Sequence, residues 1–223
     1  MSAATAPNYR LERELLRGGL SHVAGIDEVG RGPLAGPVAA AAVILNPDDL
    51  PVGLRDSKQL SPARRASLAA TIFDKALAIA LAFASAEEVD RLNIRAATLA
   101  AMARAATGLS LRPDYFLIDG RDIPPGLQAP SRALIKGDTL SLSIAAAAII
   151  AKVTRDALMA RLDPQYPAYG FAQNAGYGTL RHLGALRRLG PTPLHRASFN
   201  WRRSHRPGRI VGTSWNPLEM IDF

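Results

Sequence analysis

The stretch that decides the fold is Gly25-Ile26-Asp27-Glu28-Val29-Gly30-Arg31-Gly32-Pro33-Leu34-Ala35-Gly36-Pro37. The apolar residues that precede its carboxylates predict the end of a buried strand, and the apolar run from Val38 to Leu45 predicts the next strand. Neighbouring side chains of a strand point to opposite faces. We therefore expect Asp27 and Glu28 to approach one ion together only where the first strand ends and twists.

The turn inside this stretch indicates metal-dependent phosphoryl chemistry. Gly30 and Gly32 allow the backbone to come close to a ligand, and Arg31 between them suits a phosphate. Two carboxylates beside such a turn would repel a phosphate unless a cation lies between them.

Outside this stretch, strands and helices alternate along the chain, which predicts an α/β fold. Strands are expected over 78–84, 115–118 and 132–135, and helices over 9–17, 62–77, 94–106, 141–162 and 180–189. Ser85 is expected to cap a further short helix. In the helix that begins at residue 62, Leu68, Ile72 and Phe73 form the expected buried stripe.

Two more carboxylates follow predicted strands, Asp119 after 115–118 and Asp138 after 132–135. Sites are usually built at the C-terminal edge of such sheets. Magnesium binds carboxylate oxygens, and four carboxylates can hold two such ions about 3.5–4 Å apart. Each residue alone also has a structural interpretation, because Asp-Gly is common in turns and Asp138 suits a helix N-cap.

The remaining chemistry-bearing residues give weaker signals. The histidines at 22, 182, 195 and 205 lack zinc-ligand spacing, which favours surface positions or local hydrogen bonds. Among them, only His195, beside Arg196, is a candidate for a role in the site. The chain has no cysteine, which excludes a disulfide framework and cysteine-based zinc or nucleophile chemistry.

The 223 residues suffice for one domain with a small appendage, and their net charge of +8 is unevenly distributed. No acidic residue lies between Asp163 and Glu219, where arginines stand at 181, 187, 188, 196, 202, 203, 206 and 209. These eight account for the whole excess of the 27 basic over the 19 acidic residues. The pattern predicts a surface that follows a polyanion, with a solvated basic tail as the alternative.

Residues 1–20 lack the apolar core of a signal peptide, and no apolar run approaches the length of a membrane span. We therefore expect a soluble cytoplasmic protein that does not contact membranes.

Taken in order, these motifs resemble the ribonuclease HII family. The resemblance begins with Gly25 to Pro37 and covers roughly residues 20 to 200. It continues through Asp56-Ser57-Lys58-Gln59-Leu60-Ser61, Leu117-Ile118-Asp119-Gly120, Lys136-Gly137-Asp138, Ala151-Lys152-Val153-Thr154-Arg155-Asp156, Gly176-Tyr177-Gly178-Thr179 and His195-Arg196-Ala197-Ser198-Phe199.

The resemblance implies a ribonuclease H-like fold, with a central mixed β-sheet flanked by helices. It implies a catalytic domain over 1–200, with a small helical C-terminal element from about 160, and a basic tail of unknown role over 201–223. The implied activity is an endonuclease that hydrolyses the RNA strand of RNA–DNA hybrids. It is also expected to cut 5′ of single ribonucleotides embedded in duplex DNA, leaving 3′-hydroxyl and 5′-phosphate ends, as a step of DNA repair.

The resemblance also assigns roles to residues. It makes Asp27, Glu28, Asp119 and Asp138 the catalytic, metal-binding acids, with two Mg²⁺ or Mn²⁺ ions in the active complex. It implies that the loop of Gly30, Arg31 and Gly32 detects the ribose 2′-hydroxyl, the group that distinguishes RNA from DNA. Tyr177 is expected to pack on the sugar of the next nucleotide, and Ser57 and Lys58 to contact a backbone phosphate. The expected partner is nucleic acid and the expected oligomeric state is a monomer.

Two positions depart from the family's pattern. Ala175 stands where a basic residue often precedes Gly176, and Ala148 stands where a serine is usual.

The alternative functions fit the motifs less well. A related nuclease for plain DNA, such as a resolvase, needs neither a loop that detects the 2′-hydroxyl nor Tyr177. A basic binding protein without catalysis has no use for four acids at a phosphate-binding edge.

Overall fold

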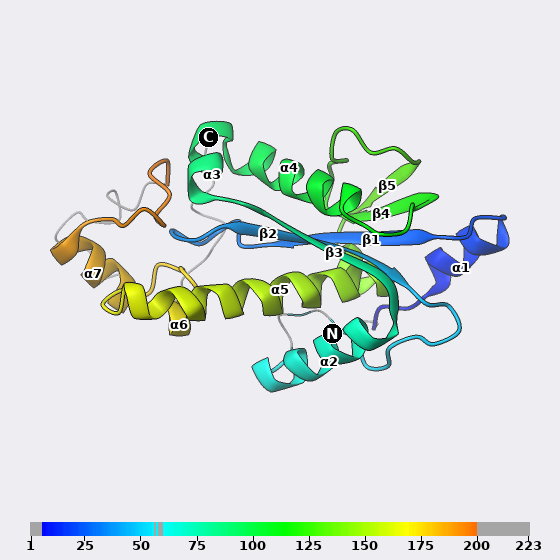
Figure 1. Ribbon diagram of the computed structural model, residues 1–223, viewed down its shortest axis with the longest axis horizontal. Coiled ribbons are helices and arrows are strands. Elements are labelled where there is room, and N and C mark those ends of the chain that lie inside the picture. Colours follow the sequence, from blue (N-terminus) through cyan, green and yellow to red (C-terminus); the bar gives the residue numbers. More distant parts are fainter. Residues whose placement is uncertain (1–5, 56, 58–59, 200–223) are drawn as a thin grey trace, which may run out of the picture.

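The sheet at the centre of the molecule is mixed, as predicted. The computed structural model describes residues 6–55, 57 and 60–199. Its five strands are β1 (Val23–Val29), β2 (Val38–Leu45), β3 (Ala76–Ala84), β4 (Tyr115–Asp119) and β5 (Ser131–Leu134). They lie in the order β3-β2-β1-β4-β5 (Figure 1). The β1–β2 and β2–β3 pairs are antiparallel, whereas β1–β4 and β4–β5 are parallel.

Helices cover both faces of this sheet. They are α1 (Arg10–Arg17), α2 (Pro62–Lys75), α3 (Ala86–Leu92), α4 (Ile94–Thr107), α5 (Leu142–Leu162), α6 (Phe171–Asn174) and α7 (Leu180–Leu189). Figure 1 shows α3 and α4 on one face and α2 and α5 on the other. The predicted Ser85 cap is present and forms a capping box with Glu88, and Ser61 caps α2 by accepting the Arg64 N–H.

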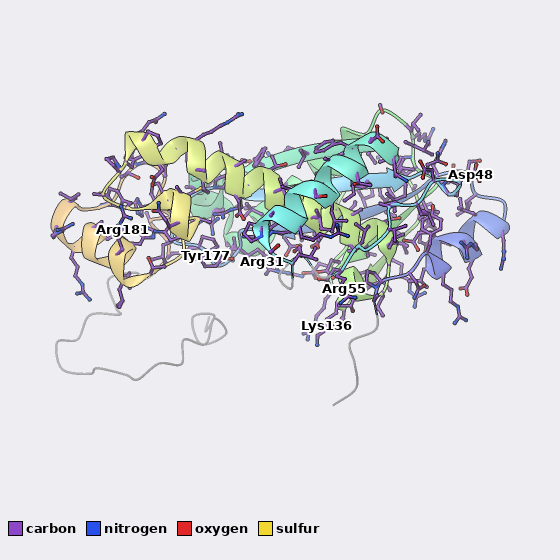
Figure 2. All side chains as sticks on the ribbon, turned by 90° about the horizontal axis from the view of Figure 1, so that it is seen from below. Arg31, Asp48, Arg55, Lys136, Tyr177 and Arg181 are labelled. Atoms are coloured by element: carbon purple, nitrogen blue, oxygen red, sulfur yellow. The ribbon has the colours of Figure 1, made fainter. Side chains whose placement is uncertain are left out.

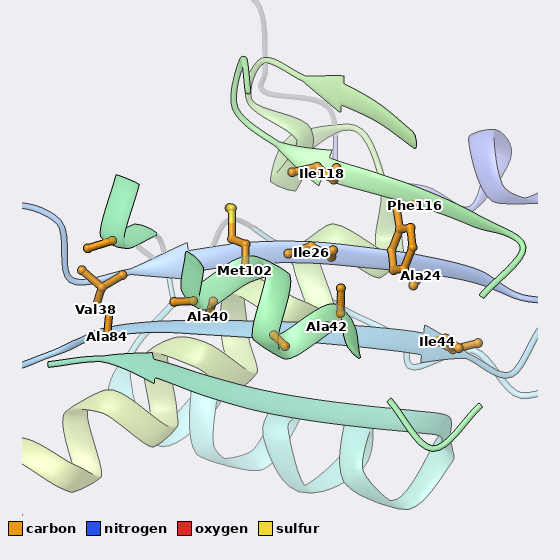
Figure 3. Packing of buried hydrophobic residues seen from close by; sticks show 14 of the residues in the cluster. Ala24, Ile26, Val38, Ala40, Ala42, Ile44, Ala84, Met102, Phe116 and Ile118 are labelled. Carbon is orange, nitrogen blue, oxygen red and sulfur yellow. The ribbon is translucent and has the colours of Figure 1, made fainter. Parts of the chain in front are cut away.

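The alternation of side chains along β1 divides the core in two. Ala24 and Ile26 pack under α4 with Met102, Phe116 and Ile118 (Figure 3). The opposite face of β1 packs on α5, and the approach at Gly25 is so close that a Cβ atom there would lie 2.2 Å from the Ser143 carbonyl carbon. The alanine-rich first half of α5 lets the helix lie this close to the sheet.

Between α5, α2 and the sheet lies a second core, which corrects one prediction. Leu68 and Ile72 are buried there, as expected, together with Ala69. The expectation for Phe73 was wrong, because this side chain is 55% exposed. One residue corresponds to a rotation of about 100° around a helix, so Phe73 lies beyond the face that Leu68, Ala69 and Ile72 direct inward.

The C-terminal helices α6 and α7 form a small unit at the end of α5 (Figure 1). Their core contains Met159, Phe171 and Leu186, and it also takes in Leu34 and Ala35 from the turn after β1. The turn singled out in the sequence is therefore packed against a segment about 150 residues further along the chain. The predicted basic tail, residues 201–223, lies outside the described residues. Within the described part of the chain, no helix is both long and apolar enough to cross a membrane.

Candidate active site

Three of the four predicted acids lie together at one edge of the sheet. The parallel pairing of β1 with β4 aligns Ile26 with Ile118, so the next residues, Asp27 and Asp119, are neighbours. Asp27, Glu28 and Asp119 each offer one carboxylate oxygen, and these oxygens lie within 4.8 Å of one another. Backbone groups orient two of them: Asp27 Oδ1 accepts the Glu28 N–H at 2.6 Å, and Asp119 Oδ1 accepts the Gly137 N–H at 2.6 Å.

The structure refines the expectation about Asp27 and Glu28. Strand β1 continues to Val29, so the pair lies within the strand's last residues rather than after its end. Asp27 is buried, whereas Glu28 is half-buried and lines a pocket beside α4. Their oxygens still converge, which places the acid cluster at the strand's C-terminal end, where side chains from both faces meet.

Asp138 lies in a 3₁₀ turn, Gly137–Thr139, between β5 and α5. It does not belong to the group of three oxygens within 4.8 Å, but it is near enough for its charge to act on Asp27. The alternative interpretation of Asp138 as a helix N-cap is wrong, because Ser141 caps α5 and accepts the Ile144 N–H.

The electrostatics of the cluster fit a divalent cation. Burial, followed by the negative charges of Glu28, Asp119 and Asp138, raises the pKa of Asp27 well above its usual value. Hard divalent cations such as Mg²⁺ and Mn²⁺ prefer carboxylate oxygens, and a cation here would relieve this repulsion. The donor set and its spacing therefore suit such an ion.

The glycine-arginine turn after β1 reaches the same edge and meets Tyr177. Gly30 has a φ of +97°, a conformation that favours glycine. A Cβ atom on Gly32 would lie 3.7 Å from the Tyr177 ring, so the tyrosine lies beside the turn and a larger residue at 32 would touch it. Arg31 is exposed, and its guanidinium lies 3.7 Å from the Glu28 carboxylate. Figure 2 shows Tyr177, Arg31, Arg55 and Lys136 on the same side of the molecule.

Two buried arginines hold this turn, and sequence reasoning missed both as supports. Arg196 donates to the carbonyl oxygens of Gly30 (2.6 Å), Arg31 (2.9 Å) and Gly36 (2.8 Å). Arg155 donates to those of Pro37 (2.8 Å), Ala35 (3.1 Å) and Ala175 (2.8 Å). Both side chains are fully buried. Arg155 thus joins the turn after β1 to the segment that carries Tyr177.

The charge of Arg196 persists despite its burial. Burial, and then the nearby Arg155, lower the pKa of Arg196 to about 9, which leaves it cationic at neutral pH. Its own segment is anchored by Asp90, which accepts the N–H groups of Ala197 and Ser198 at 2.8 and 2.9 Å. The sequence pointed to Arg196 only through the motif that contains it. Nothing in the neighbouring residues indicates which carbonyl groups its side chain binds.

His182 and His195 confirm the prediction of local hydrogen bonds. Their Nε2 atoms lie 2.9 Å apart, and both rings are buried. His182 Nδ1 must donate to the Tyr177 carbonyl, at 2.8 Å, and His195 Nδ1 must accept the Thr192 N–H, at 2.8 Å. One neutral tautomer of each ring satisfies all three bonds: His182 carries its proton on Nδ1, and His195 carries its proton on Nε2 and donates it to His182 Nε2. His195 therefore supports the Tyr177 segment through His182.

The predicted phosphate contact is described only in part. Ser57 is buried, and its carbonyl accepts a hydrogen bond from Arg65 at 2.9 Å. Lys58 lies outside the described residues, as does Asp56. Nothing in the sequence pointed to the pocket beside Glu28, which Arg95 and Asp122 help to line. Arg95 donates from Nε and Nη2 to the two carboxylate oxygens of Asp122, at 2.9 and 2.7 Å.

The five-stranded mixed sheet with helices on both faces is a ribonuclease H-like fold, shared with solved ribonucleases H2. The chain is similar to the ribonuclease H2 of Pyrococcus horikoshii OT3, with a TM-score of 0.70 and 27% identity over 82% of this chain and 96% of that one. It is similar to the ribonuclease HII in a complex with PCNA from Archaeoglobus fulgidus, with a TM-score of 0.71 and 27% identity over 85% and 98%.

Sequence comparison gives the family within this class. The model of the Ribonuclease HII family matches residues 24–202. The ribonucleases HII of Brucella ovis and Brucella anthropi are each 53% identical over 195 residues, 87% of this chain and 89% of theirs. The chain belongs to the ribonuclease HII family. It is an endoribonuclease of ribonuclease H type 2, acting on RNA–DNA, and the resemblance found in the motifs is confirmed.

Proposed function

We propose that this enzyme cuts 5′ of ribonucleotides in duplex DNA, including single embedded ones, as well as the RNA strand of hybrids. The observation that carries the proposal is the position of the Tyr177 ring beside Gly32, where a Cβ atom would lie 3.7 Å from it, a few residues from the acid cluster. A turn that comes close to a sugar and an aromatic ring that packs on the next one can together recognise a junction between RNA and DNA.

Asp27, Glu28, Asp119 and Asp138 are the proposed catalytic residues and hold two Mg²⁺ or Mn²⁺ ions. Divalent ions held there would activate a water and stabilise the leaving oxygen, and attack by that water would leave 3′-hydroxyl and 5′-phosphate ends. The protein's contribution is to hold the carboxylates in place: the Glu28 N–H orients Asp27, and the Gly137 N–H orients Asp119. With water as nucleophile, the 2′-hydroxyl serves recognition rather than attack.

Recognition is assigned to residues along the same edge. Gly30, Arg31 and Gly32 detect the 2′-hydroxyl through backbone groups and the arginine, and Tyr177 packs on the neighbouring sugar. Ser57 and Lys58 bind a backbone phosphate. The edge that Figure 2 shows also carries the exposed cations Arg55 and Lys136, which suit phosphates regardless of sequence. Ala175 adds no phosphate contact to this set, because its methyl side chain carries no donor.

We extend the proposal to the domain bounds, the oligomeric state and the location of the protein. The catalytic domain spans residues 1–200 with its C-terminal element, and the protein acts as a monomer on nucleic acid in the cytoplasm. Its task there is the removal of ribonucleotides from DNA.

Cleavage of matched duplexes tests the proposal. A DNA duplex with one ribonucleotide, an RNA–DNA hybrid and an all-DNA duplex are incubated with Mg²⁺ or Mn²⁺, and the ends are mapped. We expect a single cut 5′ of the ribonucleotide, cleavage along the hybrid and an intact all-DNA duplex. Equal cutting of the all-DNA duplex would show a plain DNA nuclease. Cleavage of the hybrid alone would remove the junction-reading role from Tyr177 and the turn.

A further inference from the structure

A buried glutamate far from the acid cluster in sequence is connected to it through the backbone. Glu12 of α1 is fully buried. Its Oε1 accepts the Ser141 hydroxyl at 2.6 Å and the Ser143 N–H at 2.9 Å, at the start of α5. The first N–H groups of the 21-residue helix α5 have no partner within the helix, and Glu12 takes the one of Ser143 at the positive end of the helix dipole.

Ser141 is the link to the acid turn. Its N–H donates to the Gly137 carbonyl at 2.8 Å, and the Gly137 N–H donates to Asp119 at 2.6 Å. Asp138 lies between these two ties. The turn is therefore held at one end by a proposed metal ligand and at the other by the residue whose hydroxyl Glu12 binds.

The acid turn needs such support because its backbone is strained. Lys136, its first flanking residue, has a φ of +57°, a left-handed conformation that is unfavourable for a residue other than glycine. Strained conformations persist only where the surrounding structure holds them. The segment before α1 adds to the support, since Asn8 pairs with the backbone of Leu140 and Leu142 on either side of Ser141.

Stability alone is a poor explanation for Glu12. Its second oxygen, Oε2, has no hydrogen-bond partner among the described residues, so the buried charge is satisfied on one side only. Apolar side chains already attach α1 to the core, because Leu11 and Leu15 pack with Leu134 and Ile144. A buried, half-satisfied carboxylate stabilises less than an apolar side chain of similar size would.

We propose that Glu12 is a positioning residue that sets the place of Asp138 by fixing the first turn of α5. The proposal rests on the proposed role of Asp138 as a metal ligand. Groups that orient a metal ligand typically contribute roughly 10–100-fold to metal affinity. Glu12 acts through Ser141 rather than on Asp138 directly, so the lower end of this range, about tenfold, is expected.

The test is Mn²⁺ binding by calorimetry to the full-length protein, with no nucleic acid present. Glu12→Gln keeps the size and removes the charge, and we expect its Mn²⁺ affinity to fall about tenfold. Glu14→Gln is the matched control, because Glu14 lies on the same helix but is exposed and paired only with Arg10. Its Mn²⁺ affinity should equal that of the wild type. A Glu12→Gln protein that melts earlier yet binds Mn²⁺ normally would overturn the proposal.

A second variant covers the case in which Glu12→Gln fails to fold. Ser141→Ala removes the hydroxyl that joins Glu12 to the turn, and it should also weaken Mn²⁺ binding; unchanged binding in this variant contradicts the proposal. Because the readout needs no substrate, it is independent of the cleavage assay. Wild-type protein that cuts no ribonucleotide-containing duplex removes the proposed function, whereas weaker Mn²⁺ binding by Glu12→Gln still supports the positioning role.

Discussion

Two turns lie at the edge of the sheet that carries the acid cluster, and they are held by side chains of opposite charge. The turn after β1 presents its carbonyl oxygens to the buried cations Arg155 and Arg196. The acid turn before α5 presents N–H groups to carboxylates: Gly137 to Asp119, and Ser143, just beyond the turn, to Glu12.

The difference in charge between the supporting side chains follows from the role that each turn is proposed to have. A guanidinium has several N–H donors in a fixed plane, so one arginine can hold carbonyls on both sides of a turn that needs exact shape. Buried cations near four acids would compete with a metal ion, however, and the acid turn is held by carboxylates instead. The arginines thus fix the backbone shape of the turn after β1, and the carboxylates keep the acid turn free of buried cations. A substitution can therefore disturb one turn without the other.

The largest effect is expected at the acids. Asp119→Asn keeps an oxygen to accept the Gly137 N–H but removes a charge from the cluster. Metal-ion catalysis contributes several kcal/mol, so we expect cleavage to slow about a thousandfold or more. Binding of a non-cleaved hybrid, measured by fluorescence anisotropy, should persist. Asp48→Asn, on an exposed loop, is the control and should be fully active. Full turnover by Asp119→Asn would remove this residue from the site.

The second effect tests the arginine-held turn. Arg196→Lys keeps the charge, but an ammonium group cannot reproduce the planar set of bonds to Gly30, Arg31 and Gly36. Misplacement of a substrate-binding turn by about 1 Å can cost roughly 100-fold in rate, and we expect a loss of that size in kcat/KM.

Mn²⁺ affinity separates this variant from the acid variants. It should be unchanged in Arg196→Lys, because the role proposed for the turn after β1 is substrate recognition and not metal binding. Arg188→Lys, exposed on α7, serves as the control. Weaker Mn²⁺ binding by Arg196→Lys would show that the two turns are not independent.

The two turns also differ in how much the sequence revealed. The strands, the caps and the four acids follow from local patterns, because burial alternation, serine caps and acids after apolar runs depend on neighbours in the chain. The supports do not. Arg196 reaches carbonyls some 160 residues away, and Glu12 reaches a hydroxyl 129 residues away. Nothing in the sequence around Glu12 indicates burial, and the docking of α1 against the start of α5 is what buries it.

The third effect concerns pH and the histidines behind Tyr177. Burial, and then the charge of His182, lower the pKa of His195 to about 4, and burial lowers that of His182 as well. The unfolded chain has the ordinary value near 6.5, so between pH 6.5 and 4 it binds more protons than the folded protein. Stability is therefore fully present above about pH 6.5 and is lost as the pH falls toward 4.

At pH 5 this loss amounts to about 2 kcal/mol for His195 alone, from 1.36 kcal/mol per pKa unit. Urea unfolding at pH 7 and pH 5 measures it. His195→Gln removes the titrating group and should show a smaller difference between the two pH values. An equal difference in the variant would assign the pH dependence to other groups.

The smallest effect is expected at Tyr177, and it addresses the separation of recognition from cutting most directly. Stacking of an aromatic side chain in a nucleic-acid complex contributes about 1–3 kcal/mol, so Tyr177→Ala should lose about tenfold in kcat/KM on a single embedded ribonucleotide. On a long hybrid the loss should be smaller, because many registers are cleavable and none depends on a junction. Tyr177→Phe keeps the ring and should behave like the wild type if packing is what matters. Equal losses on both substrates would mean that Tyr177 supports the cutting step itself. Its position beside Gly32 would then not separate recognition from cutting.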